Sequence, residues 1–144
     1  MPPTQYSILN TQYALLRQSI IPFSWTLVIG VLTGLPGKNF PDMSFWKLLQ
    51  FDSAAHAFVF LVFTFLWGVA LAKQRNFGFL SRNAVGFAAI VGVLYGISIE
   101  IMQYYIFIGR SCEFSDMVSD ATGCLIGYFV FKAVYGKVLR LQFE

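Results

Sequence analysis

The stretch DSAAHAFVFLVFTFLWGVALA, residues 52–72, decides the fold class of this chain. Its one charged residue, Asp52, stands at the start, and His56 follows four positions later. A helix needs about 20 predominantly apolar residues to cross the hydrocarbon core of a bilayer. We therefore predict a transmembrane helix here, rich in aromatic side chains.

Three further stretches have similar length and hydropathy: residues 13–35, 84–108 and 115–135. The whole composition agrees, because 57% of the residues are hydrophobic and 12% are charged, whereas soluble domains have about 25% charged residues. The sequence thus predicts an all-α fold, a four-helix transmembrane bundle, in a single membrane domain over residues 1–144.

The segments around these spans are short. Residues 1–19 are too polar for a signal peptide, so we expect them to be retained, as a short interfacial helix that leads into the first span. Between the first two spans, the segment Ser44–Gln50 gathers Phe45, Leu48 and Leu49 on one side, which predicts a short helix on the membrane surface. The net charge of +3 comes from scattered basic residues that form no stripe, so we expect no nucleic-acid partner.

The basic residues are divided unevenly between the two ends of the predicted spans. Seven fall on the side that holds both termini: Arg17, Lys73, Arg75, Arg82, Lys132, Lys137 and Arg140. Three fall on the opposite side: Lys38, Lys47 and Arg110. The positive-inside rule therefore places both termini in the cytoplasm. All acidic residues except Glu144 fall on the outer side, and the rule does not explain this because acids contribute little to orientation.

Three pairs of polar residues lie near the outer ends of the spans, at spacings that put both members of a pair on one helix face. They are Asp52 with His56, Glu100 with Gln103, and Asp116 with Asp120. Each has a structural explanation: Asp52 would cap a helix and hold His56, Glu100 would form an interhelix salt bridge, and Ser115 or Asp116 would cap the fourth span. Asp120 lies too deep for a cap. Its repulsion with Asp116 costs stability unless a proton or a cation intervenes, and Arg110 and a metal ion are the candidate cations.

Ionisable groups inside spans are costly, at about 2.5 to 3.5 kcal/mol each on insertion scales. We therefore expect these side chains to meet in one polar site near the outer face, with a purely structural network as the alternative. Two glycine pairs have the spacing that lets helices approach closely: Gly92 with Gly96, and Gly123 with Gly127. Close approach of the third and fourth spans would bring Glu100 and Asp120 together.

In their order and spacing these motifs resemble the VanZ-like family of small bacterial membrane proteins, named for a teicoplanin-resistance protein. The likeness runs from about Thr33 to Phe131. It is carried by PGKNFP (36–41), Asp52–x3–His56, Glu100–x2–Gln103, Arg110, and Ser115–Asp116–x3–Asp120–x2–Gly123–x3–Gly127. The family pattern often has Asn where this chain has Asp120, which adds a negative charge and leaves a cation-binding role open. The resemblance implies a multi-pass protein of the bacterial cytoplasmic membrane, linked in its namesake to lower sensitivity to a glycopeptide antibiotic.

Two classes of function fit these residues. In the first, the chain is a hydrolase or transferase that acts on an envelope lipid or lipid-linked head group. His56, oriented by Asp52, would be the general acid or base, and Glu100 a second acid. Arg110, Gln103 and Asp116 would bind the substrate. Asp120, Glu100 and His56 would be the ligands of a divalent metal.

In the second class the chain is a non-enzymatic accessory protein. It would bind membrane lipids, a lipid-linked envelope precursor, a glycopeptide with its lipid tail, or a partner membrane protein. A proton or ion pathway is a third alternative, but it requires polar groups across the whole bilayer, and the inner halves of the spans offer few besides Ser24, Thr26 and Thr64. A four-span chain this short is also a candidate homodimer.

Overall fold

The computed structural model describes residues 5–34, 51–74, 77–106 and 114–142, and within them the side chains of residues 16–33, 53–74, 77–106 and 114–135. These residues form the helices α1 (Gln5–Gly34), α3 (Phe51–Lys73), α4 (Gly78–Arg82), α5 (Ala84–Ile106) and α6 (Phe114–Gln142). By length and composition, α1, α3, α5 and α6 could each cross a membrane. The predicted all-α fold with four spans is therefore confirmed. A helix suits lipid because it satisfies its backbone hydrogen bonds internally.

The helix ends agree with the sequence prediction for the second and third spans and differ for the first and fourth. Helices α3 and α5 match the predicted ranges within two residues, whereas α1 begins at Gln5 and α6 continues to Gln142. Among the residues whose side chains are described, the sections apolar enough to span a membrane are Leu16–Thr33 in α1 and Phe114–Tyr135 in α6. The surface helix predicted at Ser44–Gln50 lies outside the described residues.

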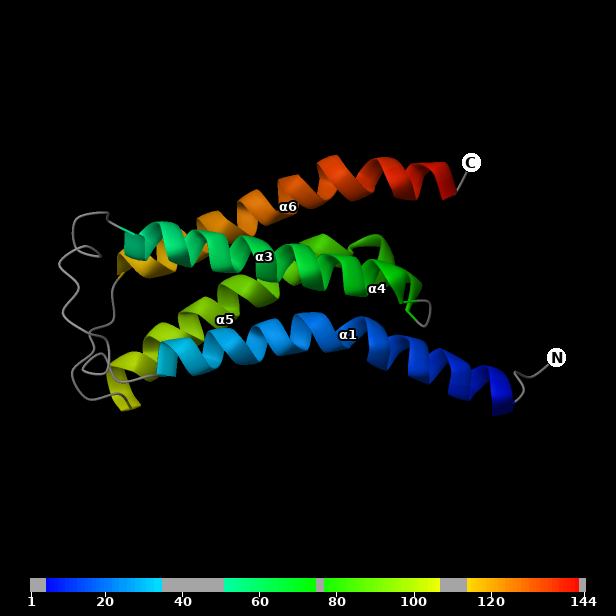
Figure 1. The fold of residues 1–144 in the computed structure, drawn as a ribbon. Helices are drawn as coiled ribbons and strands as arrows, with labels where there is room; N and C mark the ends of the chain where they lie inside the picture. The colour runs from blue at the N-terminus through cyan, green and yellow to red at the C-terminus, as the bar shows by residue number, and fades with distance from the viewer. Residues whose placement is uncertain (1–4, 35–50, 75–76, 107–113, 143–144) are drawn as a thin grey trace.

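The four long helices run alternately in opposite directions along the bundle (Figure 1). Helix α3 packs most extensively against α6 and also contacts α5 and α1, so it is the central helix of the bundle. The start of α1, the end of α6 and the short helix α4 lie at one end, and the polar pairs predicted from the sequence belong to the opposite end.

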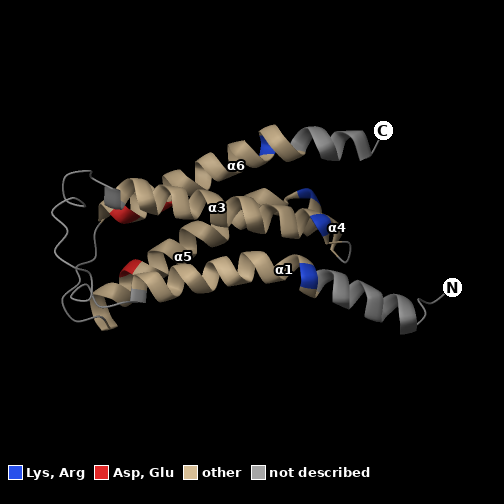
Figure 2. Ribbon diagram, in the orientation of Figure 1, with Lys and Arg blue, Asp and Glu red and all other residues tan. Residues whose placement is uncertain are grey.

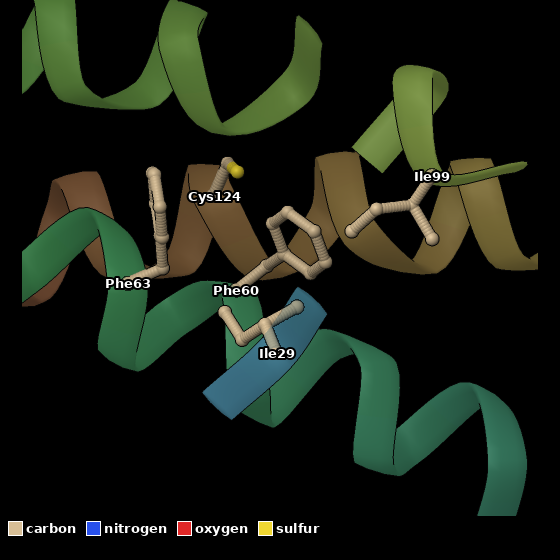
Figure 3. Packing of buried hydrophobic residues seen from close by; sticks show 5 residues of the cluster. All are labelled: Ile29, Phe60, Phe63, Ile99 and Cys124. Atoms are coloured by element: carbon tan, nitrogen blue, oxygen red, sulfur yellow. The ribbon is translucent and has the colours of Figure 1, made fainter. Parts of the chain in front are cut away.

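The bundle core is built from side chains of all four long helices. Figure 3 shows five of them close together: Ile29, Phe60, Phe63, Ile99 and Cys124. Tyr95 stacks on Phe63, with ring centroids 5.7 Å apart, and fills the space between α3 and α5. These contacts fix the heights at which the four helices meet.

Polar side chains attach α1 to its neighbours. The hydrogen bonds run from Trp25 Nε1 to Val59 O (3.1 Å), from Trp67 Nε1 to Thr26 Oγ1 (3.0 Å), from Tyr95 OH to Thr26 O (3.0 Å) and from Gln103 Nε2 to Thr33 O (3.1 Å). Tyr and Trp bury a large apolar body while their N–H or O–H group finds a partner. Helix α1 is therefore held against α3 and α5 at several heights.

Glycines set the closest approaches between helices. A Cβ atom at Gly123 would collide with the carbonyl oxygen of Ala57, and one at Gly127 would lie 2.7 Å from the carbonyl oxygen of Leu61. The predicted packing role of this pair is confirmed, although the partner is α3 and not α5. Small residues at such positions let helix backbones approach, so α3 and α6 are in backbone contact.

Many large apolar side chains point outwards from the bundle. Leu27 is 70% exposed and Tyr105 is 78% exposed, and similar residues line the outer faces of α1, α5 and α6. Soluble proteins rarely expose contiguous apolar patches of this extent. Lipid solvates such surfaces, so the outer faces agree with a multi-pass membrane protein.

Charged residues separate between the two ends of the bundle (Figure 2). Among residues with described side chains, the basic ones are Arg17, Lys73, Arg82 and Lys132, all at the end that carries α4. The acidic ones are Glu100, Asp116 and Asp120, all at the other end and all buried.

Candidate functional site

His56 and Asp120 form a hydrogen-bonded pair between α3 and α6. Nδ1 of His56 lies 2.9 Å from Oδ1 of Asp120. When Asp120 is ionised, its oxygen only accepts hydrogen bonds, so Nδ1 of His56 then carries the proton and donates it. The Asp120 side chain is 2% exposed and the His56 side chain is 16% exposed. The carboxylate is therefore buried inside the bundle, whereas the imidazole is partly accessible.

Asp116 lies one helical turn from Asp120 and faces the other side of the same imidazole. Its Oδ2 is 3.8 Å from Nε2 of His56, and its Oδ1 accepts a long hydrogen bond of 3.5 Å from the Ser115 hydroxyl. Two carboxylates at this spacing repel each other. His56 lies beside both, so a protonated imidazole would offset that repulsion.

Glu100 belongs to the same level of the bundle. Gly96 of α5 faces the side chain of Asp120, and α5 runs antiparallel to α6. One turn further toward the polar end on each helix, Glu100 and Asp116 come to the same height. Glu100 is 1% exposed and lies on the buried face of α5 together with Gly96. The register thus brings its carboxyl group to the level of the histidine pair.

Gln103 takes part in a different contact. Its side chain is 3% exposed and donates from Nε2 to the carbonyl oxygen of Thr33 at 3.1 Å. This bond joins α5 to the end of α1. The structure therefore gives Gln103 a bond that holds the helices together, and its predicted substrate-binding role stays a prediction.

For two predicted site residues the structure does not describe the side chain. Asp52 lies in the first turn of α3, one turn before His56, but its side chain is outside the described set. Arg110 lies outside the described residues altogether. The predicted orientation of His56 by Asp52, and the predicted cation Arg110, therefore stay predictions.

Metal ligation also stays a prediction. Within residues 16–33, 53–74, 77–106 and 114–135, no group of three or more His, Cys, Asp and Glu side chains is arranged to hold a metal ion. Of His56, Asp120 and Glu100, the first two form a close pair, and the carboxyl group of Glu100 is a third side chain at the same level.

Sequence reasoning missed that Asp120 is the partner of His56. The spacing rule for helices favours Asp52, four residues away, whereas Asp120 is 64 residues away. The glycines that follow Asp120 on α6 indicate close packing, but only the structure shows that Gly123 brings this helix against Ala57, the residue next to His56.

Comparison with known proteins identifies the family and nothing closer. No curated protein and no solved structure matches the chain. The family model described as VanZ/LLP1 matches residues 2–135, which include α1 as well as every helix that contributes to the polar end. The predicted resemblance is confirmed, and the match extends it to the first span. Since the match covers nearly the whole sequence, this multi-pass membrane protein belongs to the VanZ/LLP1 family.

Proposed function

We propose that this protein is an enzyme of the bacterial cytoplasmic membrane that acts on the head group of a lipid or lipid-linked envelope precursor. The observation that carries the proposal is the 2.9 Å hydrogen bond from His56 to the sealed carboxylate of Asp120. A bundle held together by apolar packing has no need of a buried imidazole–carboxylate pair, since polar groups at membrane depth are costly.

The pair has the properties of a general acid–base group. Asp120 fixes the orientation of the ring, places the proton on Nδ1 and stabilises the imidazolium that forms when His56 takes up a second proton. His56 is the side chain whose ordinary titration range includes neutral pH. Asp116, 3.8 Å from Nε2, adds a negative charge that favours the same imidazolium.

Neighbouring residues supply the other expected functions. Glu100, level with Asp116, is the candidate second acid. Arg110 would hold a phosphate or carboxylate of the head group through charge-assisted hydrogen bonds. A role in the cell envelope and in antibiotic resistance is consistent with the family.

The distribution of charge supports an orientation in which this site lies at the outer face. The described basic residues lie at the end opposite the site (Figure 2), and the positive-inside rule puts such an end in the cytoplasm. Both termini are then cytoplasmic. The polar end faces the outer leaflet, where envelope precursors are displayed.

Lipid chemistry in a defined membrane tests the proposal. Purified protein would be placed in nanodiscs of bacterial polar lipids supplemented with a lipid-linked peptidoglycan precursor, and head-group products would be followed by mass spectrometry. The wild type should form a product, and His56→Ala should lower its rate about 100-fold or more. Ser119→Ala is the matched control, because its hydroxyl only bonds the Ser115 carbonyl oxygen on the same helix.

Two outcomes would overturn the proposed enzymatic function. Equal product formation by wild type and a folded His56→Ala variant would show that the histidine has no catalytic role. Saturable binding of a lipid or glycopeptide by a wild type that forms no product would favour the alternative, a non-enzymatic accessory protein that uses the same polar end for recognition.

A further inference from the structure

We propose that Gly96 is a positioning residue, which acts through Asp120 to hold His56 in its working orientation. The inference rests on the proposed role of the His56–Asp120 pair and names the residue on the third helix, α5, that completes it. A Cβ atom at Gly96 would lie 2.6 Å from Oδ2, 3.1 Å from Cγ and 3.0 Å from Cβ of Asp120. The carboxyl group therefore lies directly against the backbone of α5.

Asp120 is thus confined from two sides. Its Oδ1 accepts the hydrogen bond from His56 on α3. Its Oδ2 is buried against Gly96 and has no hydrogen-bond partner among the residues whose side chains are described. A buried carboxylate oxygen without such a partner is normally disfavoured, because it loses the hydrogen bonds that it makes to water. Steric confinement, and not a second hydrogen bond, therefore keeps the carboxyl group turned toward His56.

The helices around Asp120 leave little room for adjustment. One turn deeper, Gly123 holds α6 in backbone contact with Ala57 of α3, so α6 is fixed relative to α3. On α5, Gly92 faces Cys124, since a Cβ atom there would lie 2.7 Å from its Sγ. A methyl group at position 96 must then turn the side chain of Asp120, and this turn breaks its bond to His56.

Gly92→Ala is the matched control for Gly96→Ala. Both residues lie on the buried face of α5, one turn apart, and both would meet a side chain of α6. The contacts at Gly92 are with Cys124 and Phe63, which belong to the apolar core. A methyl group there disturbs packing without touching the polar pair.

The single histidine of the chain gives a direct readout. In protein labelled with ¹⁵N-histidine and placed in lipid nanodiscs, the two ring nitrogens of His56 give one pair of signals. We expect Gly92→Ala to keep the wild-type signals and Gly96→Ala to move them to the values of Asp120→Ala. Wild-type signals in a folded Gly96→Ala protein would overturn the inference.

A double-mutant cycle decides the case even where Gly96→Ala folds poorly. The loss of thermal stability caused by Gly96→Ala should shrink to roughly half or less in an Asp120→Ala background and stay unchanged in Asp120→Asn, which keeps the size of the side chain. An equal loss in all three backgrounds, or an Asp120→Ala double variant that still fails to fold, would assign Gly96 to backbone packing alone and overturn the inference. Neither readout needs a substrate, so the positioning role and the proposed enzyme can fail independently.

Discussion

Gly123 of α6 lies in direct contact with the backbone of Ala57 on α3, at the residue that follows His56. Asp120 comes one turn earlier on α6, so this contact determines how closely the carboxylate approaches the imidazole. We predict that Gly123→Ala destabilises the fold by about 1 to 3 kcal/mol or more, because the methyl group meets a backbone carbonyl that cannot rotate away. Reversible unfolding in detergent measures the change.

Gly86→Ala is the control for that substitution. Gly86 lies on α5, and a methyl group added there would have no atom within 4 Å. Alanine is favoured over glycine in a helix by up to about 1 kcal/mol, so this variant should equal or exceed the wild type in stability. Equal losses at both positions would argue against the backbone contact of α3 with α6.

A second prediction concerns the attachment of α1. Trp67 donates from Nε1 to the hydroxyl of Thr26, and such interhelix bonds contribute about 0.6 kcal/mol on average in membrane proteins. Trp67→Phe and Thr26→Val should each destabilise the protein, and their double-mutant cycle should show coupling of about that size. The pair Trp67→Phe with Thr33→Val, two turns away, should show coupling near zero. The reverse pattern would contradict the placement of α1.

A third prediction concerns orientation. With the basic end in the cytoplasm, green fluorescent protein fused after Glu144 should fluoresce in intact cells, whereas alkaline phosphatase fused there should be inactive. An active phosphatase would place the polar end inside and contradict the proposed access from the outer leaflet.

A fourth prediction tests the register of α5 against α6. In a chain with Cys112 and Cys124 replaced by Ser, Glu100→Cys combined with Asp116→Cys should form a disulfide under mild oxidation, since the contact of Gly96 with Asp120 implies that the two positions lie at the same height on adjacent helices. Ile101→Cys with Asp116→Cys is the control, because Ile101 is 48% exposed on the outer side of α5. Efficient cross-linking of the control alone would remove Glu100 from the site.

Most of the fold follows from hydropathy, because lipid requires long apolar helices. Hydropathy marks only the apolar section of a helix, so the predicted spans stopped short of the polar turns that begin at Gln5 and end at Gln142. The glycine pair Gly123 and Gly127 indicated close packing, but spacing on one helix does not say which neighbour it meets.

The candidate site was predictable as a set of residues and not as a set of contacts. The position of a residue along its span can be read from the sequence. His56, Glu100, Asp116 and Asp120 could therefore be grouped at one end of the bundle. Partners within a helix follow from spacing, whereas the bond from His56 to Asp120 depends on the packing of α3 against α6. Gly96 was predicted to pack between helices, but its contact with Asp120 follows only from the register of α5 on α6.

The hydrogen bond between His56 and Asp120 is the central claim, and the ¹⁵N spectrum of the single histidine tests it most directly. In wild-type protein in nanodiscs we predict a protonated, hydrogen-bonded Nδ1, and we predict that Asp120→Asn shifts this signal while Ser119→Ala leaves it in place. A wild-type ring protonated at Nε2 alone, with a spectrum that Asp120→Asn does not change, would contradict the account.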